Sequence, residues 1–301
     1  MQARQIAVIL NARAGSARDS LAQEIANRFS ERGVSIGLRV VDGAALGEVT
    51  RETLQQGASV IVAGGGDGTI STVASMLAES DADLGVLPLG TLNHFAKDLR
   101  IPLEMQDAID TIVDGHTMRV DVGEVNGRRF INNSSLGVYP SVVTEREREQ
   151  RKGRRKLVSL ALALVRVWKR DPRSVVTLRA NGSVRMVRTP FVFVGNGEYK
   201  LEGINMTRRE SLTEGALHIC LAPDISRFEG VRMVAAALLG RLHQVEYFES
   251  SLDTSLFVEV PRAVSVSLDG EVVVLQSPLR YGVRPKALRV IVPAAPAAAK
   301  G

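Results

Sequence analysis

The clearest candidate for chemistry in this chain of 301 residues is a glycine run that carries one acidic and one hydroxyl side chain. It reads Gly64-Gly65-Gly66-Asp67-Gly68-Thr69 and lies between a continuous apolar segment and a segment with helical spacing. Glycines there let backbone N–H groups approach a phosphate, and a helix N-terminus favours negative charge. Asp67 offers a carboxylate to a metal or a ribose hydroxyl. A capped turn would explain Gly68 and Thr69 but not three preceding glycines, so the run predicts phosphate binding, outside the dinucleotide and P-loop patterns.

Two further segments follow apolar runs in the same way. The first, Pro-Leu-Gly-Thr-Leu-Asn-His-Phe-Ala over residues 88–96, contains Gly90, Thr91 and Asn93, and Asn93 could equally be a helix N-cap. The second begins at Asn11. Ligands bind at the carboxyl ends of strands in parallel sheets, so these loops could surround one polyphosphate.

A third signal, Ser-Leu-Asp-Gly-Glu at residues 267–271, lies far downstream. Asp-Gly between two strands is typical of a hairpin turn. Phosphoryl transfer to a hydroxyl also needs a carboxylate that accepts its proton, and Asp269 or Glu271 could serve.

The elements that would position these residues change in type along the chain. The sequence predicts strands at 5–11, 34–41, 59–63 and 84–88 and helices at 20–32, 46–56, 70–79 and 105–114. Apolar strands interleaved with helices indicate a Rossmann-like parallel sheet with helices on both faces, over residues 1–120.

Residues 121–284 are predicted to form a β-rich, sandwich-like second domain. Strands are expected at 118–125, 129–133, 174–180, 184–188, 191–194, 216–221, 244–249, 255–260, 263–268 and 272–275, with helices at 154–169 and 227–242. Asn-Gly pairs at 126–127 and 181–182 predict hairpins. An apolar strand at 287–292 predicts that residues 285–301 return to the first domain.

Composition excludes several classes of protein. The single cysteine, Cys220, rules out an intramolecular disulfide and is expected to be a buried thiol. No apolar run reaches the roughly 18 residues of a membrane span, so we expect a cytoplasmic protein that is soluble or peripheral to the membrane. Residues 145–156 hold seven basic and three acidic residues and account for most of the net charge of +5, which argues against nucleic-acid binding. Oligomeric state has no signal in the sequence.

The three motifs together resemble the diacylglycerol kinase catalytic-domain superfamily, which includes sphingosine and ceramide kinases, and most closely its soluble bacterial lipid kinases. The resemblance covers nearly the whole chain and extends to Asp121-Val122-Gly123 and to the segment Phe-Ile-Asn-Asn-Ser-Ser-Leu-Gly at 130–137. It implies an enzyme that transfers the γ-phosphate of ATP to a hydroxyl of a membrane lipid. An NAD kinase-like enzyme and an inactive nucleotide- or lipid-binding regulator are the alternatives.

The resemblance also implies roles for individual residues. Asn11, Gly64–Thr69, Gly90, Thr91 and Asn93 would hold the nucleotide, and Asp67 would position Mg²⁺. Asp269 would be the general base, with Glu271 as the competing assignment, and Asp121 would orient the base or its substrate. A second, structural Mg²⁺ would bind Glu214 and the carbonyls of Ser211 and Ala216, where a plain turn is the alternative.

Two positions depart from the family pattern. His94 stands where the family commonly has Asp, so metal binding would fall on Asp67, Asp98 or phosphate oxygens. Ala12 stands where proline is usual.

A basic cluster precedes the predicted helix at 154–169. Anionic headgroups attract nearby Lys and Arg side chains, so this cluster could contact an anionic membrane surface. The alternative is a helix packed on the β domain with solvated charges. The cluster consists of Arg151, Lys152, Arg154, Arg155 and Lys156.

Overall fold

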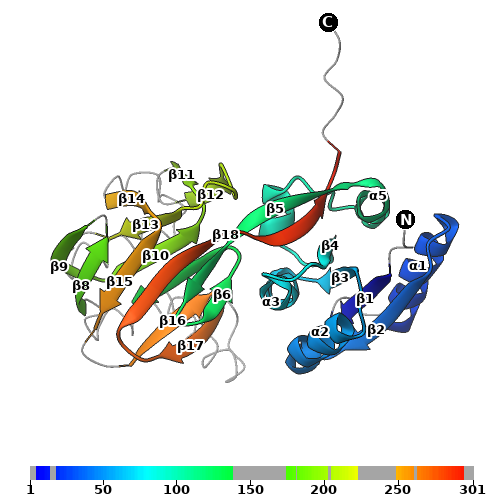
Figure 1. The fold of residues 1–301 in the computed structure, drawn as a ribbon, viewed down its shortest axis with the longest axis horizontal. Helices are drawn as coiled ribbons and strands as arrows, with labels where there is room; N and C mark the ends of the chain where they lie inside the picture. The colour runs from blue at the N-terminus through cyan, green and yellow to red at the C-terminus, as the bar shows by residue number, and fades with distance from the viewer. Residues whose placement is uncertain are drawn as a thin grey trace, which may run out of the picture. The chain divides into compact units, whose positions relative to one another are not determined.

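The chain folds into two compact units. Unit 1 comprises Met1–Val122 with Pro285–Gly301, and unit 2 comprises Gly123–Arg284. The computed structural model describes residues 5–13, 18–137, 174–180, 182–202, 205–222, 249–260 and 263–294 (Figure 1).

Unit 1 contains a parallel sheet in the order β2-β1-β3-β4, and the C-terminal strand β18 pairs with β4. The strands are β1 (Ile6–Asn11), β2 (Ile36–Val41), β3 (Val60–Gly65), β4 (Asp83–Pro88) and β18 (Leu279–Val292). Every residue of β3 and β4 is buried, as expected for strands covered on both faces. Val290 of β18 lies opposite Leu84 in parallel register, which confirms that the chain returns to the first domain.

Helices cover both faces of this sheet. They are α1 (Arg18–Glu31), α2 (Leu46–Gln55), α3 (Asp67–Leu77), α4 (His94–Asp98) and α5 (Met105–Asp114), with a short 3₁₀ turn at Gly43–Ala45. Ile25 and Phe29 of α1 share one buried cluster with Ile109 of α5, whereas α2 packs against α3 (Figure 1). The buried positions recur at three- and four-residue spacing, as the sequence predicted.

The start of α3 differs from the prediction. The helix begins at Asp67 rather than at Ile70, because the carbonyl of Gly66 accepts the amides of Thr69 and Ile70 at 3.0 and 3.1 Å. The acidic and hydroxyl residues of the glycine run therefore form the first turn of a helix.

Unit 2 is a β-sandwich. One sheet has the order β14-β13-β10-β7-β16-β17, and in the other β15 pairs with β8 and with the first residues of β18. The remaining strand bounds are β5 (His116–Val125), β6 (Arg128–Phe130), β7 (Asn133–Gly137), β8 (Ser174–Ala180), β9 (Ser183–Thr189), β10 (Phe191–Asn196), β11 (Tyr199–Glu202), β12 (Asn205–Arg209), β13 (Leu217–Leu221), β14 (Glu249–Asp253), β15 (Ser255–Glu259), β16 (Val264–Leu268) and β17 (Glu271–Leu275).

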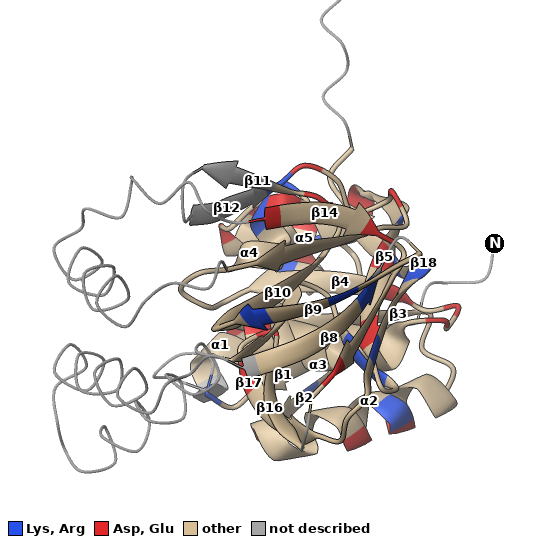
Figure 2. Ribbon diagram, turned by 90° about the vertical axis from the view of Figure 1, so that its left-hand side faces the viewer, with Lys and Arg blue, Asp and Glu red and all other residues tan. Residues whose placement is uncertain are grey.

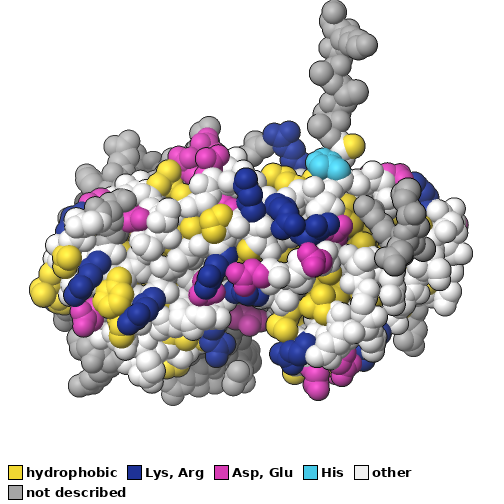
Figure 3. Space-filling model, in the orientation of Figure 1, with side chains coloured by type: hydrophobic (Ala, Val, Ile, Leu, Met, Phe, Trp, Pro, Cys, Tyr) yellow, Lys and Arg dark blue, Asp and Glu magenta, His cyan; other side chains and the backbone are white. Residues whose placement is uncertain are grey.

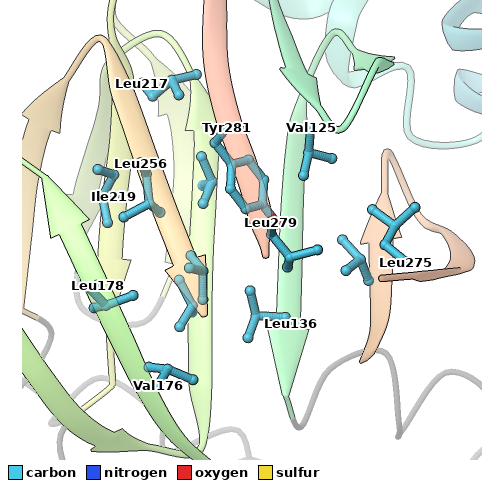
Figure 4. Packing of buried hydrophobic residues seen from close by; sticks show 14 of the residues in the cluster. Val125, Leu136, Val176, Leu178, Leu217, Ile219, Leu256, Leu275, Leu279 and Tyr281 are labelled. Carbon is cyan, nitrogen blue, oxygen red and sulfur yellow. The ribbon is translucent and has the colours of Figure 1, made fainter. Parts of the chain in front are cut away.

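The core of unit 2 lies between its two sheets. Alternate residues of the strands point into it, and Leu136, Ile219 and Leu256 from three different strands belong to one buried cluster (Figure 4). The phenol of Tyr281 lies in the same cluster and is hydrogen bonded to Ser134 at 3.0 Å. The predicted fold class, a parallel α/β domain followed by a β-rich domain, is confirmed.

Three strand predictions need correction. The strand predicted at 129–133 is two strands, β6 and β7, since the carboxylate of Asp269 binds the amides between them. Strand β14 begins at Glu249, where the predicted strand was to end. The pair β11 and β12 was missed. The helices predicted at 154–169 and 227–242 lie outside the described residues.

Candidate active site

Three loops of unit 1 meet at the carboxyl ends of neighbouring parallel strands. Asn11, the last residue of β1, donates from its side-chain amide to the hydroxyl of Thr69 at 2.8 Å. Its side-chain oxygen Oδ1 accepts the backbone amide of Arg13 at 2.9 Å. Asn11 therefore links the first loop directly to the glycine run.

The loops after β3 and β4 approach too closely for side chains. A Cβ on Gly90 would lie 2.6 Å from the Cα of Gly66 and 2.8 Å from the side-chain oxygen of Asn93. A Cβ on Gly65 would lie 2.5 Å from the Thr69 hydroxyl. Glycine is needed here because backbone packs on backbone, and the same absence of side chains leaves amides accessible to a phosphate.

Asp67 joins the two loops through its carboxylate. One oxygen accepts the amide of Asn93 at 2.9 Å and the other accepts the amide of His94 at 2.7 Å. Asp67 thus binds the start of α4, a role that the sequence did not predict.

Asn93 folds the second loop on itself. Its side-chain oxygen accepts the amide of Gly90 at 3.1 Å, and its side-chain nitrogen donates to the carbonyls of Pro88 and Gly90. It also stands at the N-cap position of α4 in a left-handed conformation, with φ of 51°. Thr91 is exposed beside it.

His94 is the exposed first residue of α4. Asp98, the other residue considered for metal binding, is half-buried at the end of the same helix. Within the described ranges no group of three His, Cys, Asp or Glu side chains converges as a metal site would require.

Asp269 anchors a distant segment of unit 2. It lies in the turn between β16 and β17 with φ of 47°, followed by Gly270 with φ of 94°. One carboxylate oxygen accepts the amides of Asn132 and Asn133 at 2.8 and 3.0 Å, and the other accepts the amide of Ile131 at 2.8 Å. Asp269 therefore lies in a hairpin turn, as the sequence allowed, and three amides hold its carboxylate in place.

The two other candidate carboxylates differ in exposure. Glu271 begins β17 and is exposed, two residues from Asp269. Asp121 is fully buried in unit 1, where it accepts the amide of Lys286 at 2.7 Å. Lys286 has φ of 53°, so Asp121 stabilises a left-handed residue within β18.

Arg209 is a buried cation of unit 2 that the sequence analysis missed. Its side chain is only 5% exposed and donates to the carbonyl of Ile131 at 2.6 Å, to the carbonyl of Asn196 at 3.2 Å and to the side-chain oxygen of Asn132 at 2.6 Å. Segment 131–133 is thus bound through its amides by Asp269 and through its carbonyl side by Arg209. The preceding run Asn-Met-Thr-Arg gave no periodic signal for a buried cation.

Tyr199 and His218 extend this polar cluster. The phenol of Tyr199 donates to the carbonyl of Asn132 at 2.8 Å, and its ring lies 5.3 Å from the guanidinium of Arg209. The amide of Tyr199 donates to Nδ1 of His218 at 3.0 Å. Burial lowers the pKa of His218, with a smaller opposing effect from Glu198.

The loop predicted to bind a structural metal forms a hydrogen-bonded turn. The amide of Thr213 donates to the hydroxyl of Ser211 at 3.2 Å, and the carbonyl of Ala216 accepts the amide of Gly197 at 3.0 Å. Glu214 is exposed.

Cys220 is a buried free thiol, as predicted, and burial raises its pKa to about 12. The basic cluster at residues 151–156 lies outside the described residues. In the described part of the chain no helix is long and apolar enough to cross a membrane.

Comparison with known proteins assigns both halves of the chain. Residues 5–125 match the family "Diacylglycerol kinase catalytic domain", and residues 135–292 match "YegS C-terminal NAD kinase beta sandwich-like domain". A Pseudomonas aeruginosa protein named "Probable lipid kinase YegS-like" is 30% identical over 96% of this chain and 95% of its own length. A Staphylococcus saprophyticus diacylglycerol kinase is 40% identical over 105 residues, which is 33% of this chain and 34% of that protein.

Solved structures agree on the fold. A crystal structure of a diacylglycerol kinase from Bacillus anthracis has a TM-score of 0.70 and 19% identity and covers 97% of this chain and 98% of its own. Two family matches that together span almost the whole sequence, with a relative aligned over nearly its full length, show that the chain belongs to the diacylglycerol kinase-type lipid kinases that include the YegS-like proteins.

Proposed function

We propose that this protein is an ATP-dependent lipid kinase that transfers the γ-phosphate to a hydroxyl of a membrane lipid. The observation that carries the proposal is the close approach of the loops after β3 and β4, where a Cβ on Gly90 would meet the backbone of Gly66. Family membership supports the same reaction class.

Unit 1 is assigned to the nucleotide. The amide of Thr69 donates to the carbonyl of Gly66, whereas helix geometry gives the amides of Asp67 and Gly68 at the start of α3 no acceptor within the helix, so these two suit phosphate oxygens. Asn11 positions the hydroxyl of Thr69 for the same ligand. The two loops leave no room for larger residues at Gly65 and Gly90, and their exposed backbone suits a polyphosphate.

Mg²⁺ would neutralise the charge on the phosphates when bound. Asp67 is the carboxylate of the glycine run, and the two amides that donate to it, from Asn93 and His94, fix its orientation. A carboxylate oxygen that accepts one amide keeps a further lone pair, so Asp67 can also contact the metal directly or through water. Further oxygen ligands would come from Asp98 of α4 or from the phosphates, because the imidazole of His94 cannot replace a carboxylate toward Mg²⁺.

Unit 2 is assigned to the acceptor lipid and to proton transfer. The carboxylate of Asp269 is already engaged by three amides, whereas the carboxylate of Glu271 is exposed. We therefore assign proton acceptance to Glu271, the competing assignment, and the positioning of segment 131–133 to Asp269, which the resemblance implied as the general base.

Two buried hydroxyls near this turn suit a polar group of the lipid, on the face of the sheet opposite to Glu271, since Glu271 pairs with the core residue Leu268. Ser135 of β7 and Ser267 of β16 lie opposite each other in the antiparallel pair, and their side chains are 2% and 1% exposed. In the described structure neither hydroxyl has a hydrogen-bond partner. Buried hydroxyls are normally satisfied, so a water or a polar headgroup atom of the lipid, other than the hydroxyl that Glu271 would deprotonate, is expected to bind them.

A phosphoryl-transfer assay tests the proposal. The protein would be incubated with γ-labelled ATP, Mg²⁺ and vesicles that contain diacylglycerol, phosphatidylglycerol or a sphingoid base, with NAD as a non-lipid control. We expect label in one lipid only. Label in NAD alone would support the NAD kinase alternative, and binding of ATP without transfer to any acceptor would support an inactive regulator.

A further inference from the structure

One face of the second sheet of unit 2 points away from the sandwich core. In strands β8, β9, β15 and β18 alternate side chains enter the core, as Leu178 and Val258 do, and the others form the opposite surface. We call this surface the outer sheet face. Its outward positions are Val175, Thr177 and Arg179 of β8, Val184, Met186 and Arg188 of β9, Ser255, Phe257 and Glu259 of β15, and Arg280 of β18.

Two arginines flank an aromatic ring on the outer sheet face. Arg179 and Arg280 are the direct cross-strand neighbours of Phe257 on either side. Their guanidinium carbons lie 5.3 and 5.8 Å from the centre of the Phe257 ring. In the described part of the chain neither guanidinium has an ion pair with a carboxylate. A groove of about 460 Å³ lies beside them.

Apolar side chains project from the same surface. Met186 is 74% exposed, Val184 is 63% exposed and Val175 is 49% exposed. Val184 lies directly opposite Arg179, so apolar and basic side chains are neighbours. In the space-filling view, hydrophobic, basic and acidic side chains are interspersed over unit 2 (Figure 3). The ribbon of β9 carries basic positions (Figure 2). Exposed apolar groups gathered on one face indicate an interaction surface.

We propose that the outer sheet face docks on an anionic lipid bilayer. The inference rests on the proposed function, because a lipid kinase must meet its substrate at a membrane. Guanidinium groups bind lipid phosphates in bidentate fashion, while Met186 and Val184 can enter the interfacial region. Three arginines share the face with Glu259 as the acidic residue, so the charge on these positions complements an anionic surface and not a neutral one.

Vesicle sedimentation without ATP tests this surface. We expect wild-type protein to bind vesicles of phosphatidylglycerol and phosphatidylcholine more tightly than vesicles of phosphatidylcholine alone. Near an anionic bilayer each basic residue contributes about fivefold in affinity, so R179Q/R280Q should bind the anionic vesicles about thirtyfold more weakly. Unchanged affinity in this double variant would overturn the proposal.

A second variant and a control separate contact from charge. V184S/M186S should weaken binding to both kinds of vesicle. R185Q is the matched control, because Arg185 lies on β9 between those residues but faces the other way and pairs with Glu249. A fivefold loss in R185Q, the loss expected for each of Arg179 and Arg280, would mean that only net charge matters and would contradict docking by this face.

Other occupants give other results. A change of molecular mass with concentration, lost in V184S/M186S, would show that the face binds a second copy of the chain. Saturable binding of soluble glycerol phosphate, lost in R179Q/R280Q without any vesicle effect, would show a small-anion pocket. Either result would overturn the bilayer proposal.

The docking and the proposed function can fail separately. Transfer to lipid dispersed in detergent micelles should be the same for R179Q/R280Q and wild type, since neither arginine belongs to the candidate active site. Vesicle binding that requires the two arginines, without transfer to any lipid, would leave the docking surface intact and refute the kinase assignment. If wild type transfers phosphate to lipid and R179Q/R280Q binds vesicles as tightly as wild type, the kinase assignment would stand and the docking surface would be refuted.

Discussion

At the scale of single residues, the carboxylates of the turn after β16 and of the start of β17 have different surroundings. Asp269 accepts three amides and Glu271 is exposed. A carboxylate that orders its surroundings and one that accepts a proton make different demands, since the first must stay hydrogen bonded and the second must reach its substrate. We propose that Asp269 and Glu271, neighbours on one hairpin, divide these two roles.

Paired substitutions distinguish the two roles. E271Q should lower turnover by about a hundredfold or more without changing the free energy of unfolding, because removal of a general base costs 10²–10⁴-fold. D269N should lower the free energy of unfolding by about 1–3 kcal/mol, because its amide nitrogen cannot accept the Ile131 amide. Steady-state kinetics and urea unfolding measure both, with E249Q on β14 as the control. Near-normal turnover in E271Q would return the base to Asp269.

His218 gives the stability of unit 2 a pH dependence. Burial lowers its pKa, and its Nδ1 accepts the amide of Tyr199 only while the ring is neutral there. The unfolded chain therefore takes up a proton near the ordinary pKa of 6.5 before the folded chain does. This contribution to stability is complete above that pH and is lost as the pH falls toward the folded pKa.

Urea unfolding between pH 5 and pH 8 measures the effect. Wild type should lose stability below about pH 6.5 more steeply than H218N, whose side-chain oxygen can accept the same amide without titrating in this range. H116N is the control, because His116 is exposed. Parallel curves for wild type and H218N would refute the assignment.

At the scale of elements, the candidate site depends on loops that pack backbone against backbone. G90A should weaken ATP binding at least tenfold, because its Cβ would collide with the backbone of Gly66 rather than with a flexible side chain. Isothermal titration with ATP measures the effect. G37A on β2 is the control, since its Cβ would meet nothing within 4 Å. Unchanged affinity in G90A would mean that these loops do not form the nucleotide site.

Sequence patterns predict the elements but not the contacts between them. Buried strands, amphipathic helices and the Asn126-Gly127 hairpin follow local rules, and the structure confirms them. The cap that Asp67 forms on α4 joins residues 26 and 27 positions apart, and Asp269 reaches segment 131–133 across more than 130 positions. Such contacts depend on which strands are neighbours, and a pattern within one segment does not contain that information.

Arg209 illustrates the limit most clearly. A short strand that contains an arginine has the pattern of a solvated edge, yet this guanidinium is buried among the carbonyls of Ile131 and Asn196. Only the convergence of segment 131–133, β10 and β12 brings these acceptors to Arg209. The glycine motifs were predictable because their chemistry is local, whereas the polar cluster around Arg209 was not.

At the scale of the whole molecule, strand β18 makes unit 1 depend on the end of the chain. Leu288, Val290 and Ile291 are buried there, and Val290 pairs with Leu84 of β4. Asp121 holds the left-handed residue Lys286 just before them. A chain that ends at Arg284 would retain all of residues 1–122 and still lack one strand of the sheet that carries the phosphate loops.

Truncation tests this dependence. A chain that ends at Arg284 should lose ATP binding and the cooperative unfolding of unit 1. The core would lack the buried side chains of Leu288, Val290, Ile291 and Val292, each contributing about 2 kcal/mol. A chain that ends at Ala294 should behave as wild type, since it keeps all of β18. Calorimetric unfolding and titration with ATP measure both. If the shorter chain binds ATP as tightly as wild type, β4 is a sufficient edge for the sheet. The C-terminal part of β18 would then not be needed for nucleotide binding.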